Sequence, residues 1–525
     1  MDWATQPNPF RRYEGAPLVR LPLPPTGNPL PYVQLYEHGA VPSQPLSRES
    51  VSLFFRYALS LTAWKRHHES TWSLRANPSS GNLHPTEGYA ILPPIDGLAE
   101  APAVYHYAPK EHGLERRALL DEPTWNNLVA PFPRGSFLVG LTSIHWREAW
   151  KYGERAFRYC QHDAGHALAT MRIAAAGLGW NLMLLHGLGT DSVARLLGVD
   201  REIDYGTAER EEPELVAVVM LERQSALRFV DEAVLSTAAV TWQGQANTLS
   251  PEHGIEWPVI DEVARATRRT TVPLIAEDFS SFPTGDDLFA TPARSSSLTA
   301  EKIILGRRSA VAFDGETSIT AEDFFRMLTR LMPARDGRSM PWDAIPWRPR
   351  IHLGLFVHRV RGLAPGLYAL ARDPDKVKSL REVMRREFRW QRVPAGSGLP
   401  LYLLQEGNYQ ALAASLSCGQ DIAGDGAFSL GMLADYKDSL RLYGAAFYRN
   451  LFWEAGMVGQ VLYLEAEAAG IRATGIGCYF DDPVHDVFGI VSRGWQSFYH
   501  FTVGGPVEDT RLTTLPAYDL EPEQY

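Results

Sequence analysis

Two long stretches of the chain carry apolar and small residues at helical spacing. In the first stretch the steps of three and four fall on Phe157, Cys160, Ala164, Leu168, Met171 and Ala175. In the second stretch they fall on Leu451, Ala455, Val458, Leu462 and Ala466. This period predicts two amphipathic helices. The small residues on both faces would let two such helices approach closely.

Short apolar runs between the helices predict β-strands. They are YAIL from Tyr89, FLVGLT from Phe137, LVAVVML from Leu215, LGLFVHRV from Leu353 and FYHFTVGG from Phe498. Strands and helices are interspersed in each part of the chain. The pattern therefore predicts the α+β class, repeated twice.

The chain repeats itself internally. The segment KYGERAFRYCQHDAGHALATMRIAAAGLG resembles LYGAAFYRNLFWEAGMVGQVLYLEAEAAGI further on. The alignment pairs Tyr152-Gly153 with Tyr443-Gly444, Arg158 with Arg449, Ala164-Gly165 with Ala455-Gly456, and Ala175-Ala176-Gly177 with Ala468-Ala469-Gly470. Such self-similarity indicates two related halves rather than one large domain.

Composition sets the boundaries of these halves. A chain of 525 residues suits two domains. Residues 1–46 are proline-rich and predict an extended arm, and residues 236–298 are rich in Pro, Gly, Ser and Thr. The predicted domains are therefore 47–235 and 299–525, joined by a connection with one short helix near 261–269.

Charge and cysteine content exclude several classes of protein. The net charge of −10 leaves no basic footprint for nucleic acid. No apolar run reaches the ~18 residues of a membrane span. Three scattered cysteines argue against a disulfide framework and fit a reducing compartment. We expect a cytoplasmic protein with no nucleic-acid partner and no membrane partner.

Two short motifs carry candidate chemistry. The segment RANPSSGNLHPTE from Arg75 predicts a tight loop rich in N–H and hydroxyl donors, which suits a heteroaromatic ring with several carbonyls. The alternative is an ordinary surface turn. GRRSAVAF from Gly306 offers paired arginines, which bind phosphate through forked, charge-assisted donors. The alternative there is a solvated helix end.

Taken in order, these motifs resemble the nitroreductase superfamily, in particular its streptolysin-type azoline dehydrogenase branch. The resemblance covers roughly 50–235 and 299–515 and includes the Lys-Tyr-Gly and Ala-Gly-His segments. It implies FMN at an interface between two intertwined subunits. One subunit supplies the Arg-Arg-Ser segment to the phosphate, and the other supplies the Pro-Ser-Ser loop to the flavin ring.

The two halves are complementary in these motifs. The first half has the Pro-Ser-Ser loop and no Arg-Arg-Ser segment, whereas the second half has the reverse. The resemblance therefore implies tandem nitroreductase-like domains that form an intramolecular pseudo-dimer. We expect one FMN per chain, a degenerate reciprocal site, and a monomer. The expected cofactor-binding residues in the two motifs are Pro78, Ser79, Ser80, Asn82, Arg307, Arg308 and Ser309.

Further roles follow from the resemblance. An amide at the position of Gln420 can read the flavin edge, and a late basic residue such as Arg511 can bind phosphate. Backbone N–H groups of Gly475, Ile476 and Gly477 can lie against the ring, since glycine permits close approach.

The pair Lys151-Tyr152 matches the family's catalytic Lys-Tyr. A lysine beside a phenol can remove a proton next to a hydride acceptor. The alternative is a solvent lysine beside a core tyrosine.

Other motifs are absent or weak. His162 and His166 have the i, i+4 spacing of metal ligands, but no third ligand is evident, so we expect no metal. Dinucleotide-binding, phosphate-loop and nucleophile-elbow fingerprints are missing.

The sequence thus predicts an FMN-dependent oxidoreductase that transfers hydride to or from a small molecule or peptide, such as an azoline-like ring. The alternatives are an NAD(P)H-dependent nitro or quinone reductase and a non-catalytic scaffold in a biosynthetic complex.

Overall fold

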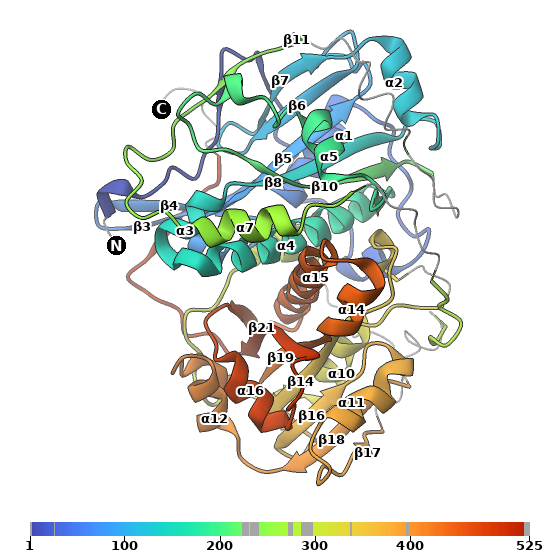
Figure 1. Cartoon of the computed structure of the whole chain (residues 1–525), viewed down its shortest axis with the longest axis vertical. Coiled ribbons are helices and arrows are strands. Elements are labelled where there is room, and N and C mark those ends of the chain that lie inside the picture. The colour runs from blue at the N-terminus through green and yellow to red at the C-terminus, as the bar shows by residue number, and fades with distance from the viewer. Residues whose placement is uncertain are drawn as a thin grey trace.

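The computed structural model describes residues 3–25, 27–222, 230, 241–270, 277–284, 298–335, 339–394 and 398–518. Two α+β halves are stacked along the long axis of the molecule (Figure 1). Each half contains one antiparallel sheet, and two long helices lie between the sheets. The predicted α+β class and the tandem arrangement are confirmed.

The sheet of the first half has the core strand order β6-β5-β8-β10-β9. Their bounds are β6 Ala103–Ala108, β5 Thr86–Leu92, β8 Phe137–Ser143, β10 Glu212–Met220 and β9 Asn181–Leu184. Every residue of β5 and β8 is buried, and their apolar stretches, 89–92 and 137–141, do not alternate with polar residues. The edge beyond β6 continues with β7 Gly113–Leu119, which pairs with β2 Leu18–Arg20 and β11 Thr241–Trp242.

The sheet of the second half repeats this order as β16-β14-β19-β21-β20. The bounds are β16 Gly366–Leu370, β14 Ile351–Val357, β19 Phe428–Asp435, β21 Trp495–Gly504 and β20 Arg472–Ile476. Two further strands extend it at the β16 edge, β18 Leu401–Glu406 and β17 Gln391–Arg392. The equal order shows that the sequence repeat is a repeat of the fold.

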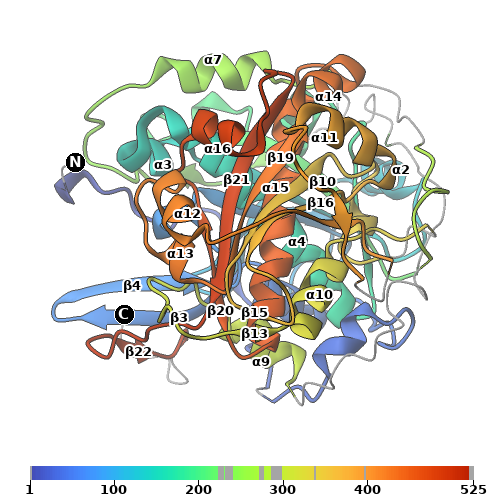
Figure 2. The ribbon, with the colours of Figure 1, turned by 90° about the horizontal axis from the view of Figure 1, so that it is seen from below.

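The predicted long helices are α4 Ala156–Gly177 and α15 Phe447–Ala468. They cross in the centre of the molecule, between the sheets (Figure 2). Each is preceded by a short helix that ends at a glycine in the left-handed region: α3 His145–Tyr152 at Gly153 and α14 Tyr436–Tyr443 at Gly444. Gly permits this sharp turn at low cost, which explains the repeated Tyr-Gly pair.

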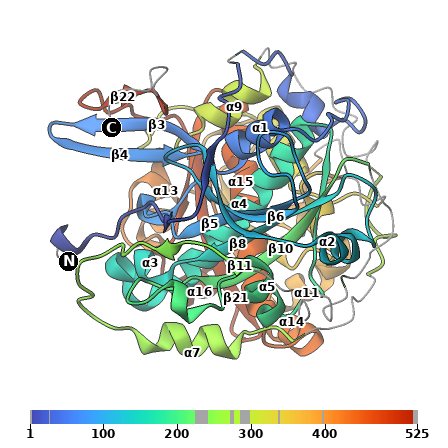
Figure 3. The ribbon, with the colours of Figure 1, turned by 90° about the horizontal axis from the view of Figure 1, so that it is seen from above.

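The two halves also exchange segments at their edges. The last strand, β22 Thr513–Leu515, pairs with β3 Leu61–His67 of the first half. Strand β3 forms a hairpin with β4 Ser70–Arg75, and Figure 3 shows this hairpin beside β22. At the start of the second half, α9 Ala300–Gly306 contacts the proline-rich segment, since Ala300 N donates to Leu30 O. The halves are therefore intertwined.

The expected strands are all present, and the short helix predicted at 261–269 is α7 Pro258–Ala266. Much of the predicted connection 236–298 lies outside the described residues. Among the described residues, no helix is long and apolar enough to cross a membrane.

The expectation of no disulfide is wrong. Cys418 and Cys478 are joined, with a Cα–Cα distance of 5.9 Å, and only Cys160 is a free thiol. The two residues are 60 positions apart in sequence. Their pairing depends on how α12 Gln410–Leu416 packs beside β20, which no spacing rule reveals.

Candidate active site

The two complementary motifs meet between the halves. Arg307 follows α9 of the second half and is buried. Its guanidinium donates hydrogen bonds to Arg75 O at 2.9 Å and to Ala76 O at 3.2 Å, both in the first half. These carbonyls directly precede loop 78–82. The structure thus brings the Arg-Arg-Ser segment and the Pro-Ser-Ser loop together once in the chain.

Loop 78–82 is shaped by local hydrogen bonds and by two left-handed residues. Gly81 and Asn82 have φ values of 58° and 60°. The Asn82 amide donates to Ser73 O at 2.9 Å, and His84 N donates to Ser79 Oγ at 2.7 Å. Ser79 and Ser80 remain partly exposed, so their outer face is open to a ligand.

A basic cluster lies beside Arg307. It consists of Arg308, Lys65 from β3 and Arg472 from β20. Burial, followed by the charges of Arg307 and Arg472, lowers the pKa of Arg308 to about 10. Burial, followed by the charge of Arg308, likewise lowers the pKa of Lys65. Within the described ranges Arg308 forms no ion pair, although its backbone N–H donates to Glu467 at 2.9 Å. Arg472 pairs with Glu467 and with Glu508 at 3.6 Å each, so the three cations of the cluster face two carboxylates and keep an excess of positive charge.

Ser309 and Gly475 are linked through a tyrosine. The Tyr463 hydroxyl lies 2.8 Å from Ser309 Oγ and accepts from Gly475 N at 3.0 Å. Ile476 pairs with His500 in the β20–β21 ladder. The backbone N–H of Gly475 is therefore already partnered, whereas the resemblance had assigned it to the ring.

Aromatic side chains connect loop 78–82 to segment 475–477. A Cβ atom added at Gly81 would lie 2.4 Å from the Tyr152 hydroxyl, and one added at Gly477 would lie 2.4 Å from the Tyr159 ring. Tyr152 and Tyr159 contact each other edge to face, with centroids 4.7 Å apart. Glycine at both positions is thus required for this close packing. Tyr152 and Tyr159 therefore link Gly81 of the first half to Gly477 of the second half.

The candidate catalytic pair has two different environments. Lys151 is exposed, and its Nζ lies 5.2 Å from the centroid of the Tyr152 ring. Tyr152 is half-buried, and burial together with the nearby Glu148 raises the pKa of its phenol. The phenol therefore remains protonated at neutral pH, and Lys151 lies beside its ring.

The remaining predicted residues lie at the rim. The Gln420 amide donates to Ser417 O at 2.8 Å and to Cys478 O at 3.3 Å, beside the Cys418–Cys478 disulfide. Arg511 is 75% exposed and pairs with Asp509 in its own loop. Gln420 thus holds the end of segment 475–477, while Arg511 forms its ion pair within its own loop.

Aromatic side chains pack together in the region of the second half that corresponds to loop 78–82. At the position that corresponds to loop 78–82, the second half places Trp347, whose ring lies 5.2 Å from that of His186 and 5.4 Å from that of Phe447. Arg350 donates to the Tyr443 hydroxyl at 2.6 Å. This packing agrees with the sequence, which lacks both motifs there.

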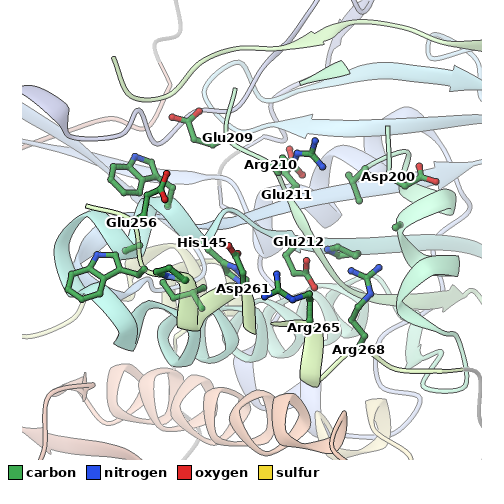
Figure 4. A pocket seen from close by; sticks show the side chains of 18 of the residues that line it. His145, Asp200, Glu209, Arg210, Glu211, Glu212, Glu256, Asp261, Arg265 and Arg268 are labelled. Atoms are coloured by element: carbon green, nitrogen blue, oxygen red, sulfur yellow. The ribbon is translucent and has the colours of Figure 1, made fainter. Parts of the chain in front are cut away.

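A separate cavity of about 890 Å³ lies on the far side of α3 (Figure 4). Helix α7 and the start of β10 form its walls, and charges of both signs line it. Its charged residues include Glu212, which pairs with Arg449, and Arg268, which pairs with Asp191. It is distinct from the residues that the motifs predicted.

Several site residues carried no sequence signal. Lys65 and Arg472 each stand alone in sequence, and only the β3 and β20 strands bring them to Arg308. Asp163 lies between His162 and His166, and the i, i+4 spacing of the two histidines is the stronger sequence signal there. Those histidines are buried and bond Phe498 O and Gln460. The described residues contain no group of three or more His, Cys, Asp and Glu that could hold a metal ion.

Comparison with known proteins agrees with the geometry. A crystal structure described as a nitroreductase from Anabaena variabilis superposes with a TM-score of 0.68 at 21% identity, over 97% of this chain and 95% of that chain. A nitroreductase-like protein of Methanocaldococcus jannaschii is 30% identical over 122 residues, which are 22% of this chain and 56% of that protein. A chain of the E. coli microcin synthetase McbBCD complex overlaps 47% of this chain and 87% of that chain, with a TM-score of 0.29 and 19% identity.

The sequence model of the nitroreductase family matches residues 43–207 and again residues 304–505. The first match covers most of one sheet, since β10 lies beyond it, and the second match covers the other sheet; each match includes one long central helix. Together they cover more than half of the chain. The protein therefore belongs to the nitroreductase family.

Proposed function

We propose that this protein is an FMN-dependent oxidoreductase with a single flavin site between its two halves. The observation that carries the proposal is the contact of Arg307 with the carbonyls of Arg75 and Ala76. It joins the phosphate-binding motif of one half to the ring-binding motif of the other. Since each motif occurs once, the chain can build this site once.

The phosphate end of the site fits a flavin nucleotide. Arg308, Lys65 and Arg472 repel one another, and the carboxylates of Glu467 and Glu508 contact this cluster through Arg472. A phosphate carries about two negative charges and accepts several charge-assisted hydrogen bonds. Bound there, it would relieve the repulsion that lowers the pKa of Arg308.

The ring end fits through loop 78–82. Ser79 and Ser80 are partly exposed, so the loop presents hydroxyl groups toward ring carbonyls. When bound, the flavin would supply hydride transfer, and the protein would supply orientation and donors. Tyr152, packed on Gly81, lies where it can hold or give a proton beside a substrate, with Lys151 next to it.

We infer an azoline-like ring in a small molecule or peptide as the substrate class. The support is the Lys151-Tyr152 pair, because ring oxidation requires removal of a proton together with the hydride. Reduction of a nitro or quinone compound by NAD(P)H requires no such base. A turnover assay with both substrate types in Lys151→Ala separates these activities.

Flavin stoichiometry tests the single site. Purified protein reconstituted with FMN should release about one flavin per chain after denaturation, because the first half lacks the Arg-Arg-Ser segment and the second half lacks the Pro-Ser-Ser loop. Absorbance of the released flavin against protein concentration gives the ratio. Two tightly bound flavins per chain would refute the single site, and none would refute the flavin function.

Sedimentation tests the internal pseudo-dimer. The intertwined contacts that the family forms between subunits are satisfied here within one chain, for example by β22 on β3. We therefore expect a monomer of 58.6 kDa that retains FMN. An obligate dimer whose flavin site is completed by a second chain would contradict this arrangement.

A further inference from the structure

Two acids occupy equivalent places on the central helices. Asp163 precedes the Ala-Gly pair of α4, and Glu454 precedes the matching pair of α15. Each accepts hydrogen bonds from the loop that leads into the neighbouring sheet. Asp163 accepts from Ser80 N at 3.2 Å, and Glu454 accepts from the backbone of Arg350 and Ile351 at about the same distance. Both acids thus hold equivalent loops through hydrogen bonds from the backbone.

The surroundings of the two acids differ in charge. Glu454 forms a fully buried ion pair with Arg372 and accepts from the Trp347 indole at 3.2 Å. Its negative charge is therefore compensated. In the described part of the chain, Asp163 has no ion pair, although it is only 2% exposed. A buried carboxylate without a cation is costly, so the first half places a titratable group where the second half has a fixed one.

A second acid lies close to Asp163. Glu148 of α3 is fully buried, and neither of its carboxyl oxygens has a hydrogen-bond partner among the described residues. Burial and the charge of Asp163 hold the pKa of Glu148 well above its usual range. Burial raises the pKa of Asp163 to about 7, despite its bonds to Ser79 and Ser80.

No cation of the packed elements stands directly against this carboxylate. The groups that feel its charge are Glu148 and Tyr152 of α3, Cys160 of its own helix and Tyr499 of β21. Lys151 acts on Glu148 from the solvent side. The contacts of Asp163 itself are to the loop, through Ser80 N and Ser80 Oγ at 3.2 to 3.3 Å.

We propose that Asp163 is a positioning residue whose protonation turns the Ser80 hydroxyl from an inward donor into an outward donor. Ionised Asp163 accepts the Ser80 O–H, which leaves that hydroxyl unable to donate to a ligand. Protonated Asp163 donates its own O–H to Ser80 Oγ, and the serine hydrogen then turns to an acceptor seated on loop 78–82. The proton moves between the Asp163 carboxyl and solvent, and no bond to carbon is made or broken. This inference rests on the proposed flavin site for the identity of the ligand.

The test is the pH dependence of FMN binding, measured by quenching of flavin fluorescence between pH 5.5 and 8.5. Wild-type protein should bind FMN about fivefold more tightly below pH 7 than above it, the value of one neutral hydrogen bond. Asp163→Asn resembles the protonated acid, so it should bind at all pH values as tightly as wild type does at low pH. Ser80→Ala should bind weakly at all pH values. Asp482→Asn, whose side chain is 99% exposed, is the control and should keep the wild-type profile.

Two outcomes overturn the proposal. One is an Asp163→Asn profile that falls with pH like wild type, and the other is a Ser80→Ala profile that still shows the wild-type step. Infrared difference spectra of the flavin-free protein give a second measurement. A carboxyl band should titrate near pH 7 in wild type and Asp482→Asn, and disappear in Asp163→Asn.

The two measurements separate this proposal from the proposed function. If wild type binds no FMN while the infrared band titrates near pH 7 and depends on Asp163, the flavin function fails and the titrating acid stands. If FMN binds but no such band exists, the acid proposal fails and the flavin function stands.

Discussion

Gly165 of α4 and Gly456 of α15 pack backbone against backbone where the two halves meet. A Cβ atom added at Gly165 would lie 2.2 Å from Trp453 O, and one added at Gly456 would lie 2.3 Å from His162 O. Asp163 and Glu454 flank this crossing, and each lies two residues before a glycine of the pair. The distance between the two helices therefore determines where Asp163 and Glu454 hold their loops.

Gly165→Ala should separate the helices, because the obstructing atoms belong to backbone and cannot rotate away. We expect the free energy of unfolding to fall by about 1–3 kcal/mol, as for other overpacked cores. Urea unfolding followed by circular dichroism measures this change. Gly177→Ala on the same helix is the control, since its nearest neighbours lie at 3.6 Å or beyond. Equal stability of Gly165→Ala and wild type would show that the crossing tolerates a side chain.

Arg308→Ala should weaken FMN retention at least tenfold, because a charge-assisted bond to phosphate contributes about 1.5–3 kcal/mol. Equilibrium dialysis against FMN gives the dissociation constant. Arg493→Ala replaces an exposed arginine outside the basic cluster and is the control. It should leave the dissociation constant of FMN unchanged. Riboflavin, which lacks the phosphate, should bind Arg308→Ala and wild type equally well. A loss that is as large for riboflavin would place Arg308 away from the phosphate.

Lys151→Ala should keep the yellow colour of bound flavin and lose about a hundredfold in substrate oxidation, the usual contribution of a proton-transfer group. Its Nζ stands outside the core of the site, beside the Tyr152 ring, so folding should be unaffected. Steady-state turnover and the flavin absorption band are the two readouts. Lys378→Ala, at a side chain that is 88% exposed, is the control. Full activity in Lys151→Ala would favour simple flavin-mediated reduction without this base.

The pH dependence of stability should reveal Asp163. Its folded pKa, about 7, is above the ordinary value of 3.8, so the folded state binds a proton more tightly than the unfolded state. Its contribution is fully present below about pH 4 and is lost as pH rises through 7. Wild type should therefore lose more stability than Asp163→Asn between pH 4 and 8. Thermal melts of both proteins across this range measure the difference, and parallel curves would contradict a titrating Asp163.

The disulfide predicts how many cysteine thiols are free before and after reduction. After denaturation without reductant, alkylation should label only Cys160, and after reduction it should label all three cysteines. Intact-mass spectrometry gives the count. A crosslink that closes a loop of this length stabilises a protein by about 2–4 kcal/mol, so reduction should lower the melting temperature. Cys160→Ser is the control, and reduction should lower its melting temperature as it does for wild type. Three free thiols in the absence of reductant would rule out the disulfide.

The sequence predicts the elements well because local patterns determine them. The three- and four-residue spacing of small residues identifies both central helices, and the apolar runs identify the core strands. The loop 78–82 and Arg307 are found because their residues are contiguous. Lys65, Arg472 and Asp163 are not found, since each is an isolated charged residue whose role depends on a neighbour from another strand or helix.

The errors have the same physical origin. Cys418 and Cys478 look unrelated in sequence, yet α12 and β20 bring them to bonding distance. Gly475 was expected to face a ring with its N–H, but the Tyr463 hydroxyl accepts that hydrogen. Long-range packing decides both, and the periodicity of one segment holds no information about it.

Because β22 pairs with β3, a strand of the second half is built into a sheet of the first half. The tail of the second half completes a sheet of the first, and residues near Leu30 hold the start of the second. A protein built this way is suited to division into two fragments, because each fragment would carry strands that only the other can complete. Two coexpressed fragments, divided within the connection between the halves, should then associate with each other. Recovery of the site would show that they have associated.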